Sequence, residues 1–137
     1  MERFAIAAVL VVIALAVAFV AQRRRGAAAS GVPHSSVPAS VDLGSLGIDA
    51  GPAIVVFTEE TCRTCAAAIA VVRGPAGAGL PVTEVPFADE RELHRRHGID
   101  TVPTTVVADP DGNVVDGWIG RVELSALAAA LAQVRNR

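Results

Sequence analysis

The sequence predicts an α/β domain with a central mixed β-sheet and helices on both faces, placed after an amino-terminal transmembrane helix. Three observations support this prediction. Residues 4–21 form an uncharged apolar run, which is typical of a membrane-spanning helix. Short β-branched runs at 53–58 and 104–108 are typical of buried strands, and segments with helical character, such as 121–134, separate or follow them. Strands alternating with helices indicate a sheet whose two faces are both covered.

The apolar run at 4–21 is long enough to cross a bilayer, because as a helix it would be about 27 Å long. A cleaved signal peptide is an alternative, since the alanines at 27–29 would suit a cleavage site, and a buried soluble helix is another. The run is long for a signal peptide, and Glu2 offsets the charge of Arg3. We therefore predict a single-pass anchor within residues 1–25, with the lipid bilayer as its partner.

The residues after the apolar run predict an orientation and a tether. Three arginines at 23–25 follow the run, and the positive-inside rule favours the cytoplasmic side over the extracytoplasmic side for the following domain. Residues 26–40 are rich in Ala, Ser, Gly, Val and Pro without an amphipathic period, which is typical of a flexible linker. Residues 41–137 then have room for one domain.

The first part of this domain predicts a loop followed by a central strand. Residues 37–43 are a candidate for a short first strand, and three glycines and a proline within 44–52 predict a loop. Residues 53–58 are a continuous apolar run that ends in a polar residue. This pattern predicts a central strand buried on both faces.

Helices and further strands follow in alternation. Residues 62–72 predict an alanine-rich helix, with Thr61 as the N-cap candidate and Gly74 at its end. The Asp-Pro-Asp-Gly sequence at 109–112 predicts a tight turn within a β-hairpin. The other predicted elements are an extended segment at 81–87, a helix at 89–97 that Asp89 caps and Gly98 ends, the strand at 104–108, a return strand at 113–119, and an amphipathic helix at 121–134 with Leu124, Leu127, Leu131 and Val134 at helical spacing.

Charge and composition exclude several classes of partner. From residue 30 onward, eight arginines against thirteen acidic residues leave a formal charge of −5. A nucleic-acid partner is disfavoured, because phosphate binding requires a basic stripe. The sequence also has no Gly-rich nucleotide loop, so we predict that no cofactor is bound.

The two cysteines, Cys62 and Cys65, are spaced so that one helical turn brings their sulfurs together. Cys62 falls at a predicted helix start, where unpaired N–H groups and the helix dipole stabilise the reactive thiolate. Arg63 adds a positive charge, whereas Glu59 and Glu60 would oppose its effect. Cys65 lies almost a turn further into the helix and should be less exposed, which suits a resolving thiol.

A zinc site is an alternative use of the cysteines. His94 and His97 complete a C-x2-C-x28-H-x2-H pattern. That spacing is much longer than in compact zinc fingers, and both histidines lie in the charged segment ELHRRHG, which is typical of a solvated helix face. We therefore predict a solvated helix here and no metal site.

Three motifs together resemble the thioredoxin family and occur in the family's order. They are VVFTEETCRTC at 55–65, HGIDTVPTTVV at 97–107 and DPDGNVVDGWIG at 109–120. The resemblance covers roughly residues 37–137 and implies a thioredoxin-like fold with thiol-disulfide oxidoreductase activity. It also implies two kinds of partner, a disulfide-bearing protein substrate and a separate thiol-redox partner.

The resemblance implies roles for four residues by their positions in the motifs. Cys62 matches the attacking thiol and Cys65 the resolving thiol. Pro103 matches a proline that follows a cis peptide bond and faces the cysteines. Val102, which precedes it, would offer backbone groups to an extended substrate.

The chain also departs from thioredoxins proper near the cysteines. Val56 stands where they carry a buried aspartate, and Glu84 falls where they have a lysine beside that acid. Glu84 is therefore a candidate proton acceptor, although a surface carboxylate on a strand is the simpler interpretation. The remaining differences are Thr58 and Thr61 in place of two tryptophans and Arg63-Thr64 in place of Gly-Pro, while Trp118 is interpreted as hairpin packing.

Two functional hypotheses follow in addition to the zinc-stabilised domain. The first is a membrane-tethered thiol-disulfide oxidoreductase that acts through Cys62 and Cys65. The second is a binding module that uses the groove beside Pro103 without turnover. Retention of both cysteines favours the enzyme, because a scaffold has no physical need for two thiols.

Overall fold

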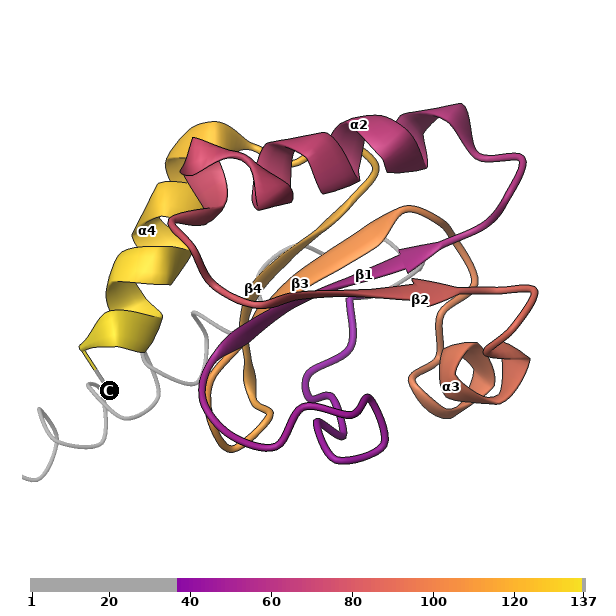
Figure 1. Cartoon of the computed structure of the whole chain (residues 1–137), viewed down its shortest axis with the longest axis horizontal. Coiled ribbons are helices and arrows are strands. Elements are labelled where there is room, and N and C mark those ends of the chain that lie inside the picture. The colour runs from indigo at the N-terminus through magenta and orange to yellow at the C-terminus, as the bar shows by residue number, and fades with distance from the viewer. Residues whose placement is uncertain (1–36, 137) are drawn as a thin grey trace, which may run out of the picture. The chain divides into compact units, whose positions relative to one another are not determined.

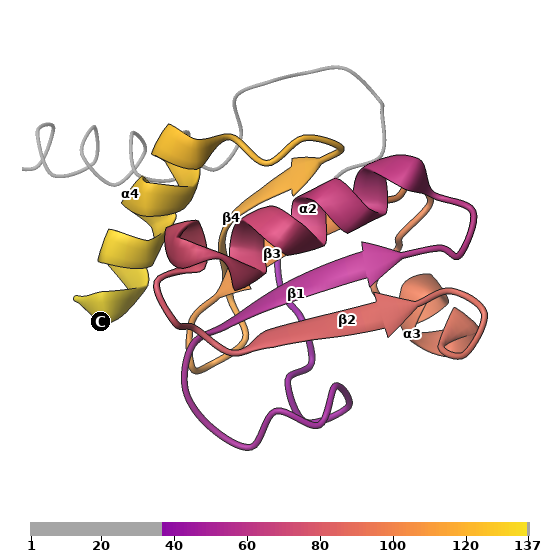
Figure 2. The ribbon, with the colours of Figure 1, turned by 45° about the horizontal axis from the view of Figure 1, so that its top comes forward.

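The computed structural model describes residues 37–136, in which four strands form one mixed sheet with helices on both faces (Figures 1 and 2). The strand order is β2-β1-β3-β4; β1 pairs with β2 in parallel, and the other neighbours pair antiparallel. The predicted fold class is thereby confirmed for this part of the chain. The elements are β1 (Ala53–Thr58), α2 (Arg63–Arg73), η1 (Pro75–Gly77), β2 (Val82–Pro86), α3 (Arg91–Arg96), β3 (Thr104–Ala108), β4 (Val114–Ile119) and α4 (Leu124–Arg135).

The predicted membrane segment lies outside the described residues. Among the helices that the structure describes, none is both long and apolar enough to cross a bilayer.

Strand β1 is the centre of the sheet, and all six of its residues are buried. Because side chains alternate along a strand, Ile54 and Val56 face one layer while Val55 and Phe57 face the other. This double burial confirms the prediction from the continuous apolar run at 53–58.

Helices α2 and α4 cover the first face of the sheet (Figure 1). Trp118 packs against this layer, as predicted. The predicted start of α4 at residue 121 is wrong, because Val122 is buried in the core before the helix begins at Leu124. Leu124 is also 57% exposed and does not join the apolar face. The core of this layer consists of Ile54, Val56, Ala68, Val72, Val107, Val122, Leu127, Ala130, Leu131 and Val134.

The second face is covered by α3 together with the non-helical segment at 41–48. The predicted first strand at 37–43 is wrong, because only Ser40 forms a bridge, to Asn113 at the start of the hairpin's return strand. Pro38 has no N–H to extend a ladder, and the chain turns from Leu43 onward. Gly112 fixes this attachment: its φ is +82°, and a Cβ there would lie 2.3 Å from the Val41 carbonyl oxygen.

Helix α3 is shorter than the sequence predicted, and one of its histidines is buried in the core. It spans Arg91–Arg96, its N-cap position is Glu90, and Asp89 does not cap it. The prediction of a solvated face is wrong for His94, which is 2% exposed and donates through Nε2 to the Val85 carbonyl oxygen at 2.7 Å. Its ring packs edge-on against Phe57 and Phe87, with centroids 5.2 and 5.3 Å away.

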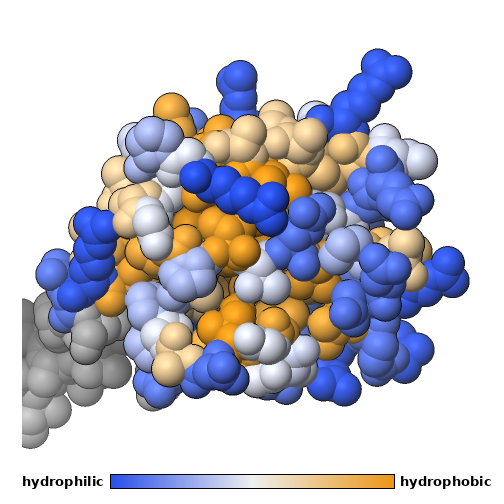
Figure 3. All heavy atoms as spheres, in the orientation of Figure 1, coloured by the Kyte–Doolittle hydropathy of each residue, from blue (hydrophilic) through white to orange (hydrophobic). Residues whose placement is uncertain are grey.

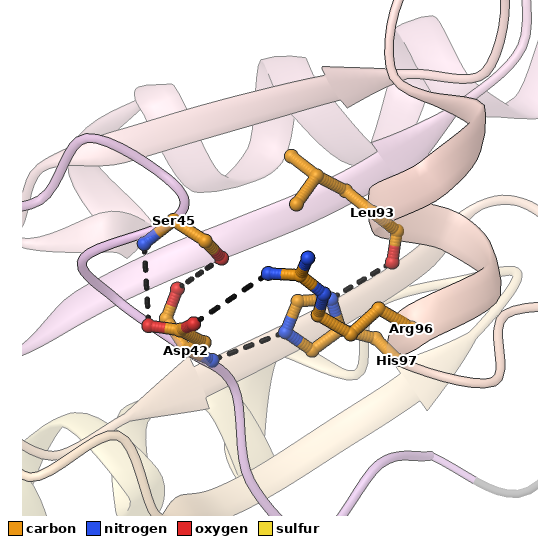
Figure 4. Close-up of polar contacts among 5 residues, drawn as sticks. All are labelled: Asp42, Ser45, Leu93, Arg96 and His97. Carbon is orange, nitrogen blue, oxygen red and sulfur yellow. Dashed lines mark hydrogen bonds and ion pairs between the residues drawn. The ribbon is translucent and has the colours of Figure 1, made fainter.

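His97 ties α3 to the segment at 41–48 (Figure 4). Its Nδ1 donates to the Leu93 carbonyl oxygen at 2.8 Å, and its Nε2 accepts from the Asp42 backbone N–H at 3.1 Å. The carboxylate of Asp42 accepts from the Ser45 backbone N–H and lies 3.8 Å from Arg96. The neutral imidazole therefore joins two segments that are far apart in the sequence.

We predict that Thr105→Val stabilises the protein. Thr105 is fully buried between Val56 and Trp118 of the neighbouring strands, and its hydroxyl has no hydrogen-bond partner. Because an unsatisfied buried hydroxyl costs free energy, its replacement by a methyl group should raise the free energy of unfolding by about 1 kcal/mol. Urea denaturation measures this change. A lower midpoint would show that the hydroxyl has a partner in solution.

Candidate functional site: a disulfide at the amino terminus of α2

A loop joins the end of β1 to the start of α2 (Figures 1 and 2). The cysteine pair lies where this loop enters the helix. Cys62 and Cys65 form a disulfide, with their Cα atoms 5.4 Å apart. Cys62 itself is the N-cap residue, and its Sγ accepts from the Cys65 backbone N–H at 3.2 Å. The prediction that Thr61 caps the helix is therefore wrong, because the sulfur occupies the capping position.

The two cysteines differ in their exposure to solvent. Cys62 is partly exposed, whereas Cys65 is only 3% exposed on the inner side of α2 with Ala68 and Val72. Arg63 and Thr64, between the cysteines, are exposed. This asymmetry leaves one sulfur accessible to a large partner and shields the other, as the spacing predicted.

Val102 and Pro103 lie at the same end of the sheet as the last residues of β1. In the antiparallel pairing of β1 with β3, Phe57 lies opposite Thr104, so the residues just before Thr104 sit beside the end of β1. The peptide bond between Val102 and Pro103 is cis, as the resemblance implied. Pro103 is buried and Val102 is partly exposed.

Two cavities lie at this end of the sheet. The larger, of about 370 Å³, is lined by both cysteines together with residues of β1, β2 and the α2 helix. The smaller, of about 160 Å³, is lined by Val102, Phe87 and His94 among others. Glu59 lines both cavities. Glu59, between β1 and the cysteines, therefore borders one cavity with the cysteines and another with Val102.

Glu84 also lies at this site, on β2. It pairs in register with Val56 of β1, so both side chains point to the face that α2 covers. Its Oε1 accepts from the Thr58 hydroxyl at 2.9 Å, and its Oε2 lies 3.8 Å from Arg73. Glu84 lines the same cavity as both cysteines.

The sequence did not identify Thr58 as a partner of Glu84. Thr58 is 2% exposed and lies two residues after Val56 on the same face of β1. Their contact depends on the parallel pairing of β1 with β2. In this pairing Glu84 lies opposite Val56, and Thr58 is the next residue of β1 on the same face. That register is fixed only when the strands pair, so the spacing of 26 residues gave no indication.

The histidines of the alternative zinc pattern do not approach the cysteines as ligands. Both rings are held by backbone groups, His94 by Val85 and His97 by Leu93 and Asp42. Within residues 37–136, no group of three or more His, Cys, Asp or Glu side chains is placed to hold a metal ion.

The domain is α/β, with a disulfide at a helix start and a cis-proline just before β3. Comparison with solved structures identifies the fold as thioredoxin-like. The structure is similar to thioredoxin 1 of Thermosipho africanus TCF52B (TM-score 0.52, 14% identity, 61% of this chain and 98% of that chain). It is also similar to the thioredoxin of Malassezia sympodialis (TM-score 0.52, 24% identity, 77% and 96%) and to a reduced Schistosoma mansoni thioredoxin pre-protein (TM-score 0.52, 18% identity, 69% and 89%). No protein-family profile matches the sequence, and neither does any curated protein.

We predict that Cys62→Ala is less stable than Cys62→Ser. Neither variant forms the disulfide, but the serine hydroxyl can accept the Cys65 N–H that the sulfur now accepts, whereas alanine cannot. Loss of an N-cap acceptor should lower the free energy of unfolding of the alanine variant by about 1 kcal/mol relative to serine. Denaturation in urea with reductant present compares the two. Equal midpoints would show that the cap contributes nothing.

Proposed function

We propose that this protein is a membrane-tethered thiol-disulfide oxidoreductase that exchanges electrons with protein disulfides. The observation that carries the proposal is the Cys62–Cys65 disulfide at the start of α2, with an accessible first sulfur and a buried second one. The thioredoxin-like fold and the cis bond before Pro103 support it.

The chemistry follows from the placement of the two sulfurs. In the reduced protein, the Cys62 thiolate at the helix terminus attacks a substrate disulfide and forms a mixed disulfide. Cys65 then attacks the Cys62 sulfur, which releases the substrate as a dithiol and forms the Cys62–Cys65 disulfide. A separate thiol-redox partner must return two electrons before the next cycle.

Val102 is proposed to align the substrate. Its backbone precedes β3 and lies beside the end of β1, and the residue is partly exposed. An extended segment of the substrate would hydrogen-bond to this backbone as an added strand does, while Pro103 stays buried beneath it.

A non-catalytic binding module is the second candidate. The observation that favours it is Val56, an apolar residue of the core beneath α2 at the position where thioredoxins carry an acid. Such a module would bind a partner at the same end of the sheet and would not need to cycle its disulfide.

We predict that a redox titration separates these candidates. The full chain in mild detergent, equilibrated in dithiol buffers and alkylated, should show a reversible two-electron transition of Cys62 and Cys65. A midpoint near about −270 mV indicates a reductant, and one near about −120 mV an oxidant of exported proteins. Cys65→Ser is the control, since it cannot form the intramolecular disulfide. Absence of a transition at any potential would exclude the enzyme and leave the binding module.

The side of the membrane is also a proposal. Arginines 23–25 after the apolar run at 4–21 support a cytoplasmic domain, because positive residues beside a span tend to stay inside.

We predict that an impermeant maleimide labels the reduced cysteines only after cells are permeabilised. A permeant maleimide should label them in intact cells, and a variant without cysteines gives the background. Labelling of intact cells by the impermeant reagent would place the domain outside.

A further inference from the structure

We propose that Glu84 of β2, positioned by Thr58, takes the proton of Cys65 when the mixed disulfide is resolved. This inference rests on the proposed oxidoreductase function and specifies its proton transfer. It assigns to a neighbouring strand the acid that β1 lacks, since Val56 is apolar.

The need for such a group follows from the burial of Cys65. At 3% exposed, its thiol has little contact with bulk water, yet it must lose a proton before the sulfur can attack. The two core residues of β1 on this face, Ile54 and Val56, are apolar and cannot accept a proton. A base must therefore come from another element that borders the same cavity.

Four carboxylates border the cavity with Cys65: Glu59, Glu60, Glu84 and Asp89. All four residues are exposed, but Glu59, Glu60 and Asp89 come from loops. The Glu84 side chain is 34% exposed and extends from the sheet. Hydrogen bonding within the sheet fixes the backbone of Glu84. We therefore take Glu84 as the carboxylate whose position relative to α2 is best fixed.

Two contacts orient the Glu84 carboxylate. The buried Thr58 hydroxyl donates to Oε1 at 2.9 Å, and Arg73 near the end of α2 lies 3.8 Å from Oε2. Thr58 also borders the cavity, so its hydrogen bond holds the carboxylate at the cavity wall. At about 370 Å³ the cavity has room for water, which can carry a proton between Cys65 and Glu84.

In the mixed disulfide, the S–H bond of Cys65 breaks, and the proton passes to Glu84, directly or through water. The Cys65 thiolate attacks the Cys62 sulfur, so a Cys62–Cys65 bond forms while the bond from Cys62 to the substrate sulfur breaks. The substrate thiolate leaves with that electron pair and takes a proton from solvent, and Glu84 returns its own proton to solvent. The two cysteines are oxidised and the substrate disulfide is reduced.

The experiment follows the two chemical steps separately. The full chain in detergent is reduced and mixed in a stopped-flow instrument with an aromatic disulfide that releases one coloured thiolate per step. Attack by Cys62 gives the first phase, and resolution by Cys65 gives the second, of equal amplitude. If the wild-type protein gives no second phase, the proposed function fails. If it gives both phases, the role of Glu84 can be tested independently.

In Glu84→Gln, the first phase should change less than about twofold, and the second should slow by on the order of 100-fold near neutral pH. The second phase should also become about tenfold faster per pH unit, because only the ionised thiol then reacts, whereas the wild-type dependence is shallower. Glu60→Gln removes the same charge from the same cavity and is the matched control. A second phase that Glu84→Gln leaves unchanged, or that both variants slow equally, overturns the proposal.

Thr58 provides a test that does not depend on the folding of Glu84→Gln. Thr58→Val keeps the carboxylate but removes its hydrogen-bond donor, so the second phase should slow about tenfold and gain steepness with pH. Thr58→Ser keeps a hydroxyl and should restore the wild-type pH dependence. A valine variant with the wild-type pH profile would show that Thr58 does not position the proton acceptor.

Discussion

The burial of β1 on both faces is the constraint on which the rest of the structure depends. A strand whose every residue is buried requires a layer on each side, and α2 with α4 forms one layer while α3 with residues 41–48 forms the other. Thr58 is the last residue of this strand, and the chain leaves the core there. Glu59, Glu60 and Thr61 are exposed after it, and the cysteines follow directly at the start of α2.

The sequence was sufficient for features that depend on local pattern. Apolar β-branched runs predicted β1 and β3, and the Asp-Pro-Asp-Gly turn predicted the hairpin between β3 and β4. It was insufficient where distant segments decide the outcome. The segment at 37–43 pairs at Ser40 alone. His94 is buried although four of the six residues of α3 are charged, because Phe57 of β1 and Phe87 enclose its ring.

The same distinction applies to the site. The spacing of Cys62 and Cys65 predicted their proximity because one helical turn sets it. The contact of Thr58 with Glu84 joins residues on two strands, and it depends on the parallel register of β1 with β2. No local pattern encodes that register, so the sequence indicated Glu84 as a candidate without indicating what positions it.

A carboxylate costs less desolvation free energy at Glu84 than it would at Val56. A carboxylate at Val56 would lie in the fully buried central strand, where an ionised group is costly unless it is paired and hydrogen-bonded. Strand β2 is at the edge of the sheet, so a carboxylate at Glu84 borders the cysteine cavity while about a third of its side chain, 34%, contacts solvent. This exposure lowers the desolvation cost and gives a proton on Glu84 a path to bulk water. The domain can therefore keep an apolar core beneath α2, which β1 supplies through Val56. The adjacent strand β2 supplies the titratable group, Glu84, that borders the cavity with Cys65.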